Sequence, residues 1–124
     1  MTQFKAIFNK GKYMIHVGLS LYAWHEDGIF YIYSPALDLT GYGTNANEAK
    51  DSFEITLKEF INYTDNKKTI FDELEHLGWF VNRKKRKVLL PDFEDLINEN
   101  TAFKEIINKS GVEKIERNIE LALA

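Results

Sequence analysis

The sequence contains no cysteine, which excludes a disulfide framework, a cysteine-based metal site and a thiol nucleophile. No apolar run approaches the roughly 20 residues that a membrane-spanning helix needs. The first residues, Met1 to Lys5, lack the basic segment and long apolar stretch of a classical secretion signal. We therefore expect a protein that is neither secreted by that route nor membrane-spanning, and that resides in the cytoplasm.

Charge is distributed unevenly along the 124 residues, whose formal net charge is −3. Residues 1–66 hold five basic and eight acidic side chains, and residues 67–124 hold eleven of each. A hydrophobic share of 44% and an aromatic share of 14% indicate a globular protein with a real core. The most linker-like stretch is Asp65 to Lys68, so we divide the chain into residues 1–66 and a C-terminal α/β extension, residues 67–124, that packs on the first part.

Three segments of the first part have the pattern of strands. In residues 3–9 the even positions are apolar and alternate with Gln3, Lys5 and Asn9, and residues 13–24 carry apolar side chains at the odd positions from Ile15 to Ala23. Asp27-Gly28 is a favoured dipeptide for a two-residue hairpin, and residues 29–33 after it are rich in β-branched and aromatic side chains. The sequence predicts a three-stranded antiparallel meander.

The stretch from Gly41 to Tyr63 predicts an amphipathic helix that covers this meander. Gly41 and Gly43 indicate a tight turn, and Asn45 with Glu48 three residues later forms the N-x-x-E variant of a capping box. Apolar side chains then recur at spacings of three and four, at Ala49, Phe53, Leu57, Phe60 and Ile61. One face of this helix therefore needs a sheet to lie on.

The C-terminal half predicts further mixed structure, so the fold class is α+β. The expected order is a helix over residues 69–78, a β-hairpin with strands at 79–81 and 88–90, and two short helices between residues 92 and 111. Residues 112–124 fit a helix through Ile115, Ile119 and Leu123, and they also fit an alternating strand. Both interpretations stay open, and the strand is favoured.

The familiar patterns of catalytic and metal-binding residues are absent. His16, His25 and His76 fall in no H-x-x-x-H or H-E-x-x-H spacing, and no serine lies in a G-x-S-x-G elbow. Gly41 and Gly43 form G-x-G without the rest of the dinucleotide fingerprint. We expect no catalytic residue, no metal site and no cofactor.

The order of motifs over residues 29–63 resembles the HicB-like antitoxin family. Members of that family carry an aromatic-rich strand, a D-L-x-G element, a small-residue turn, and a capping residue followed by Glu-Ala at the start of a helix. Here these motifs are Ile29 to Tyr33, Asp38-Leu39-Thr40-Gly41, Tyr42-Gly43-Thr44, and Asn45 with Glu48-Ala49. The family often has proline before the glycine and cysteine after it, where this chain has Thr40 and Tyr42.

This resemblance implies a partial RNase H-like fold and a non-enzymatic antitoxin. Such a protein would bind a small basic RNA-cleaving toxin of HicA type, covering its basic surface and catalytic histidine with a mildly acidic one. A two-metal nuclease is disfavoured because active RNase H-like enzymes place their first carboxylate on the first strand, and residues 1–25 contain no aspartate or glutamate. A free-standing scaffold domain without a toxin is a further alternative.

Two sets of side chains are candidates for contacts with other molecules. The first is aromatic, of the kind that protein interfaces use, and we expect it or an edge strand to bind a partner or a second copy in a dimer: Tyr22, Trp24, Tyr31 and Tyr33. The second is a basic run that predicts salt-dependent nucleic-acid binding by a regulator, or else a solvated hairpin tip: Arg83, Lys84, Lys85, Arg86 and Lys87.

Overall fold

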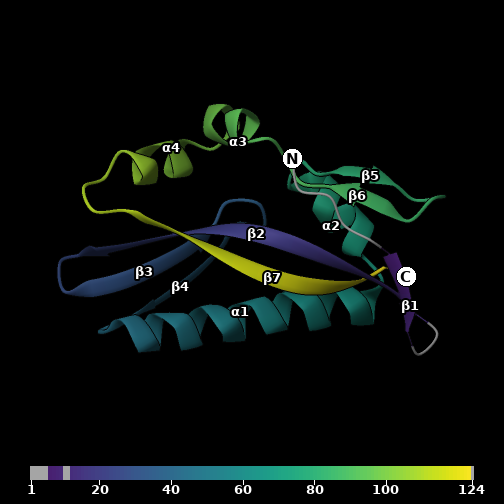
Figure 1. The fold of residues 1–124 in the computed structure, drawn as a ribbon, viewed down its shortest axis with the longest axis horizontal. Coiled ribbons are helices and arrows are strands. Elements are labelled where there is room, and N and C mark those ends of the chain that lie inside the picture. Colours follow the sequence, from purple (N-terminus) through teal and green to yellow (C-terminus); the bar gives the residue numbers. More distant parts are fainter. Residues whose placement is uncertain (1–5, 10–11, 124) are drawn as a thin grey trace.

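The computed structural model describes residues 6–9 and 12–123, with side chains from Met14 on. Within these residues the chain is an α+β protein with one five-stranded antiparallel sheet, a separate two-stranded sheet and four helices (Figure 1). The elements in chain order are β1 (Ala6–Asn9), β2 (Lys12–Glu26), β3 (Ile29–Ser34), β4 (Leu39–Gly43), α1 (Ala46–Lys67), α2 (Ile70–His76), β5 (Phe80–Asn82), β6 (Lys87–Leu89), α3 (Phe93–Glu99), α4 (Thr101–Ile107) and β7 (Glu113–Leu123).

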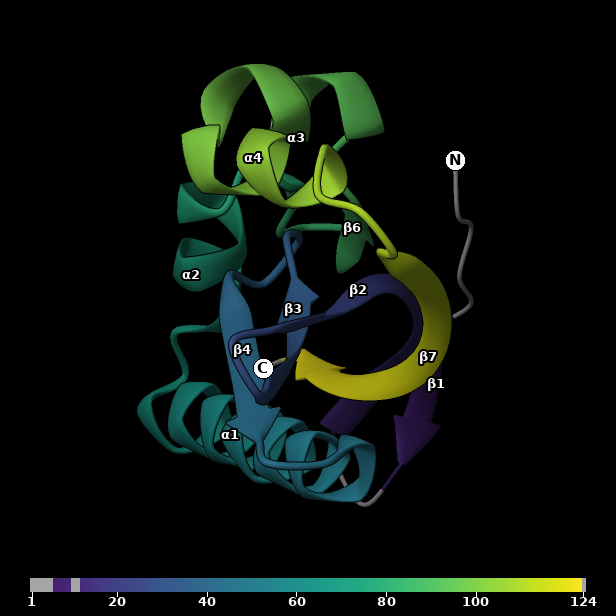
Figure 2. The same cartoon turned by 90° about the vertical axis from the view of Figure 1, so that its left-hand side faces the viewer.

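Strand β2 is the centre of the sheet because it pairs along both edges. On one edge it pairs with β1 near its start and with β3 near its end. On the other edge β7 runs antiparallel to it, from Leu123 opposite Tyr13 to Glu113 opposite Ala23. The strand interpretation of the last segment is therefore confirmed, and the first and last described strands, β1 and β7, belong to one sheet (Figure 2).

The meander has a fourth strand, β4, that the sequence did not predict. Gly41 and Gly43 were expected in a tight turn, and that prediction is wrong, because both lie in β4, which pairs with β3. The two-residue hairpin is as predicted, since Asp27 and Gly28 have φ values of 53° and 79°. The predicted start of the first strand, at residues 3–5, lies outside the described residues.

Helix α1 begins where the capping residues predict. The Asn45 side chain accepts a hydrogen bond from the Glu48 amide at 2.9 Å. The Glu48 carboxylate reaches back to Thr44, whose amide and hydroxyl donate to Oε1 at 2.9 and 2.7 Å. Both bonds lower the pKa of Glu48, and the bond from the Thr44 hydroxyl has the larger effect. The helix then buries Ala49, Phe53 and Leu57 against one face of the sheet.

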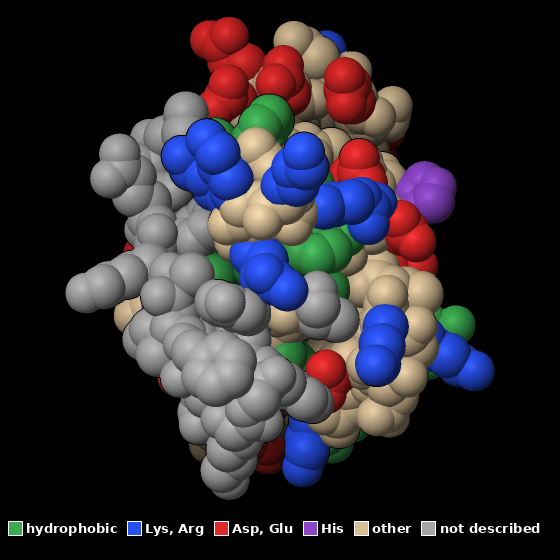
Figure 3. Space-filling view, turned by 90° about the vertical axis from the view of Figure 1, so that its right-hand side faces the viewer, with side chains coloured by type: hydrophobic (Ala, Val, Ile, Leu, Met, Phe, Trp, Pro, Cys, Tyr) green, Lys and Arg blue, Asp and Glu red, His purple; other side chains and the backbone are tan. Residues whose placement is uncertain are grey.

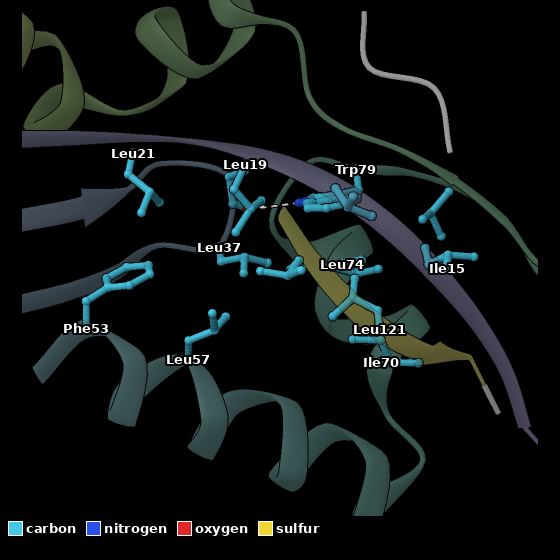
Figure 4. Close-up of a cluster of buried hydrophobic side chains, with 14 of the residues drawn as sticks. Ile15, Leu19, Leu21, Leu37, Phe53, Leu57, Ile70, Leu74, Trp79 and Leu121 are labelled. Carbon is cyan, nitrogen blue, oxygen red and sulfur yellow. Dashed lines mark hydrogen bonds between the residues drawn. The ribbon is translucent and has the colours of Figure 1, made fainter. Parts of the chain in front are cut away.

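One continuous core joins residues from both halves of the sequence. Leu21 of β2 lies above Phe53 of α1 at one end of this core, and Leu121 of β7 lies beside Ile70 and Leu74 of α2 at the other (Figure 4). Trp79 fills the space between the helices and the sheet, and its Nε1 donates a hydrogen bond to the Ala36 carbonyl at 2.7 Å. The segment beyond residue 66 therefore contributes to the same core as the segment before it.

Candidate partner-binding surface

The face of the sheet opposite α1 carries the predicted aromatic residues, but α4 covers half of them (Figure 1). Tyr22 and Tyr33 lie opposite each other on β2 and β3 and are only 8% and 4% exposed. Phe103 of α4 is fully buried against them, with its ring centroid 5.0 Å from that of Tyr22. Tyr22 and Tyr33 were expected on a binding surface, and the structure corrects this by placing them in the interior.

A hydrogen-bonded network holds α4 on this face. The Tyr33 hydroxyl donates to Asp38 Oδ1 and accepts from Asn100 Nδ2, both at 2.7 Å. Asn100 also caps α4, because its Oδ1 accepts from the Phe103 amide at 3.0 Å. Burial first, and then the hydrogen bond to Asp38, raise the pKa of Tyr33 to about 12. One phenol thus connects β3, the turn after it and the start of α4.

This network makes a prediction about alkaline pH. The phenol of an unfolded chain has a pKa of about 10, so a folded-state pKa of about 12 means that the neutral phenol stabilises the fold fully below about pH 10 and less as the pH rises through 12. Tyr33→Phe should lower the free energy of unfolding by about 1–3 kcal/mol at neutral pH, since Asn100 loses its acceptor. In urea titrations, the free energy of unfolding should fall less between pH 10 and pH 12 for the variant than for the wild-type protein. Equal declines in both proteins would contradict this.

Three further aromatic side chains form a row across the sheet, and the innermost of them, Trp24, packs partly against the cluster around Phe103. Trp24 on β2 lies opposite Tyr31 on β3, which lies opposite Tyr42 on β4. The rings of Trp24 and Tyr31 are stacked, with centroids 5.0 Å apart and planes at 14°. Trp24 and Tyr31 are half-buried, whereas Tyr42 is 64% exposed. We call these three residues the aromatic row.

Tyr42 is absent from the residues that the sequence predicts for this surface. Its position opposite Tyr31 depends on β4, and two glycines make that strand hard to recognise from its composition. The amide of Tyr42 donates to the Ser52 hydroxyl of α1 at 3.2 Å, which orients this part of the strand edge. Only the pairing of β3 with β4 reveals that Tyr42 continues the row.

The charges beside the aromatic row are acidic or already paired. Glu26 follows Trp24 on the same face of β2, and its carboxylate accepts a hydrogen bond from Lys109 Nζ at 2.8 Å. Asp27 is exposed at the neighbouring hairpin turn. A phosphate backbone would meet no free cation in this group of residues. The row therefore suits a protein partner better than a nucleic acid.

The basic run lies around the tip of the β5–β6 hairpin. Arg83 is not a free charge, because its Nη2 lies 2.6 Å from Asp72 Oδ1 and also donates to Glu75, both on α2, while its guanidinium lies 5.5 Å above the ring centre of Phe71. Lys84, Lys85 and Lys87 are exposed, and Arg86 is half-buried. Figure 3 shows basic side chains on this side of the molecule with acidic ones beside them. Arg83 therefore shares its charge with Asp72 and Glu75, and nucleic-acid binding by the five-residue run stays a prediction.

The histidines lie apart in the fold. His16 Nδ1 lies 3.5 Å from Glu120 Oε1, His25 stacks on Phe30, and His76 is in the last turn of α2. Among the residues that the structure describes, no group of three or more histidine, aspartate or glutamate side chains could hold a metal ion. No described helix is long and apolar enough to cross a membrane.

No family model matches the chain, and no curated protein or solved structure matches it. The resemblance to HicB-like antitoxins stays a prediction. It rests on the motif order of residues 29–63. The aromatic row does not depend on that resemblance, because strand pairing and ring stacking define it.

Proposed function

We propose that this protein is a non-enzymatic, cytoplasmic antitoxin of the HicB-like type, which binds and neutralises a small basic RNA-cleaving toxin of HicA type. The observation that carries the binding role is the aromatic row, whose outermost member, Tyr42, leaves 64% of its surface exposed. Large amphipathic rings on a rigid sheet are the side chains that dominate the binding energy of protein interfaces. The motif order of residues 29–63 supplies the choice of partner.

The charge of the protein supports a basic partner. The formal net charge is −3, and the charge of Lys109 is paired with Glu26, which follows Trp24 on β2. A mildly acidic surface attracts a basic RNA-binding protein and disfavours RNA itself. The antitoxin would then act by covering the toxin's RNA-binding surface rather than by any reaction of its own.

Two exposed tyrosines allow a matched test of this surface. Tyr42 on β4 is 64% exposed and Tyr63 on α1 is 59% exposed, so truncation of either to alanine should change the free energy of unfolding by less than about 0.5 kcal/mol. Tyr42→Ala should weaken binding to the toxin about tenfold or more, whereas Tyr63→Ala should leave it unchanged. Calorimetry with the small basic protein encoded beside this gene measures both.

The genes next to this one show whether a toxin exists whose binding can be measured. A small basic protein encoded next door that co-purifies with this chain supports the proposal. An isolated gene, or a neighbour that does not bind, would sink it and leave the free-standing scaffold domain. Equal losses in Tyr42→Ala and Tyr63→Ala would show that the aromatic row is not the contact surface.

A nucleic-acid-binding regulator is the second candidate, favoured by the three exposed lysines at the hairpin tip, Lys84, Lys85 and Lys87. Two-stranded ribbons with basic side chains do enter nucleic-acid grooves. It ranks below the antitoxin because Arg83 is held by Asp72 and Glu75. Titration of a labelled duplex with the purified chain at low and high salt separates the two candidates. Binding that weakens steeply with salt supports the regulator, and no binding at low salt contradicts it.

A further inference from the structure

The outer edge of β7 is open over its first half. β7 pairs with β2 along one edge, and no strand among the described residues pairs with the other. Its second half is closed off, since Leu121 and Leu123 are buried in the core and α2 lies beside them. Exposed strand edges tend to pair with another chain.

The middle of β7 carries a barrier that limits where a second strand can pair. The Arg117 guanidinium is bound by both carboxylate oxygens of Glu54 on α1, at 3.0 and 2.6 Å, and it also donates to the carbonyl of Asn118. Side chains that reach across a strand in this way block pairing. The accessible part of the edge is therefore residues 113–116.

We infer that two copies of this chain associate through this edge, with β7 of each copy antiparallel to β7 of the other and Ile115 of both copies at the two-fold axis. In such a two-fold pair both copies contribute the same residues, so every contact away from the axis occurs twice. Ile115 is half-buried in the single chain and would face its own copy. The inference concerns self-association and does not depend on the proposed toxin.

Charge complementarity selects this register. Centring on Ile115 places Lys114 opposite Glu116 of the other copy, so the two-fold axis creates two pairs of opposite charge. Registers centred on Lys114, Glu116 or Arg117 place a charge opposite its own copy, and like charges opposite each other in a sheet are destabilising. A register centred on Asn118 places Glu116 opposite Glu120.

The pair that would exchange between copies is held only by exposed contacts, among them a hydrogen bond from Ser20 Oγ to Glu116 Oε1 at 3.2 Å. Lys114 and Glu116 are 59% and 64% exposed, and Lys114 Nζ lies 3.6 Å from Glu116 Oε1 within the same strand. That exposed pair is weak and easily exchanged for one between copies. β7 and β4 lie at opposite edges of the order β7-β2-β3-β4, so dimerisation would leave both aromatic rows accessible.

Charge reversals test the register directly by sedimentation equilibrium of the full chain over concentrations up to about 0.5 mM. Lys114→Glu and Glu116→Lys should each weaken dimerisation about tenfold, because each turns two attractive pairs into two repulsive ones. An equimolar mixture of the two variants should dimerise again, since each supplies the charge that the other needs. The double variant K114E/E116K should also recover the wild-type association.

Each outcome bears on the inference. A wild-type chain that stays monomeric over the whole concentration series overturns it, including the case in which this edge takes a strand from a different protein. A dimer that all four proteins form equally well also overturns it, because the contact then lies elsewhere. Circular dichroism spectra and melting curves check that the variants fold, and recovery in the mixture cannot arise from misfolded chains.

Discussion

Replacing Gly41 with alanine should lower the free energy of unfolding by at least about 3 kcal/mol, one of the two largest effects expected for a single substitution in this protein. A Cβ at this position would lie 2.3 Å from the amide nitrogen of Phe53, 2.5 Å from its Cα and 2.6 Å from its Cβ. No side-chain rotation relieves a clash with backbone atoms. Helix α1 would have to move away from β4.

A second glycine provides the control for this experiment. Gly28, in the β2–β3 turn, has φ of +79° and no atom within 4 Å of an added Cβ. Gly28→Ala therefore introduces backbone strain alone, which costs about 1 kcal/mol. Urea titrations should show a loss for Gly41→Ala about three times as large. If the two losses are equal, α1 is not packed against the backbone of β4 as described.

Replacing Trp79 with alanine should cost about 3–5 kcal/mol, the usual range for removing a buried large aromatic side chain. Trp79 is 4% exposed and belongs to the core that α1, α2 and the sheet share. Its removal also leaves the Ala36 carbonyl without the indole donor. The turn that contains Ala36 leads to β4, so the loss should also loosen the strand that carries Tyr42.

Two further variants separate packing from hydrogen bonding at this position. Trp79→Phe keeps a large ring and removes the donor, so it should cost about 1–3 kcal/mol. Phe80→Ala alters the next residue, whose side chain is 55% exposed, and should cost less than about 0.5 kcal/mol. Denaturation followed by fluorescence and by circular dichroism should give one shared transition. Two separate transitions would mean that the segment beyond residue 66 unfolds alone.

The elements that were predicted correctly are those whose signals lie within a few residues of one another. The cap of α1 depends on Asn45 and Glu48, three positions apart, and the β2–β3 hairpin depends on Asp27 and Gly28. The β5–β6 hairpin is likewise close to its predicted strands. Local hydrogen bonds and backbone preferences are enough to specify such elements.

Strand β4 was missed because its glycines are explained by a contact that is distant in sequence. Composition favours a turn wherever two glycines stand close together, as at Gly41 and Gly43. Their actual role is to let the first turns of α1 approach the strand, since a Cβ added at Gly41 would lie only 2.3 Å from the Phe53 amide nitrogen. The position of Tyr42, and with it the full aromatic row, followed from that contact.

The candidate surface was predicted only in part, for the same reason. Residue type and alternation identified an aromatic face on β2 and β3, but they cannot distinguish a bare face from a covered one. The cover comes from Phe103, about 80 residues after Tyr22, and from Asn100, whose side chain binds Tyr33. The ion pairs of Arg83 with Asp72 and Glu75 were also not predicted, because only the packing of α2 beside the hairpin brings these carboxylates to it.

Periodicity and capping thus specified an α+β chain with an amphipathic helix over an antiparallel sheet, because a repeating pattern already defines which face of an element is apolar. Choosing between a strand and a helix for the last segment needed its partner. The eleven residues of β7 satisfy either pattern in isolation, and pairing with β2 along their whole length settles the matter by satisfying the backbone along one edge. That pairing also leaves the opposite edge open at Ile115, which no local pattern reveals.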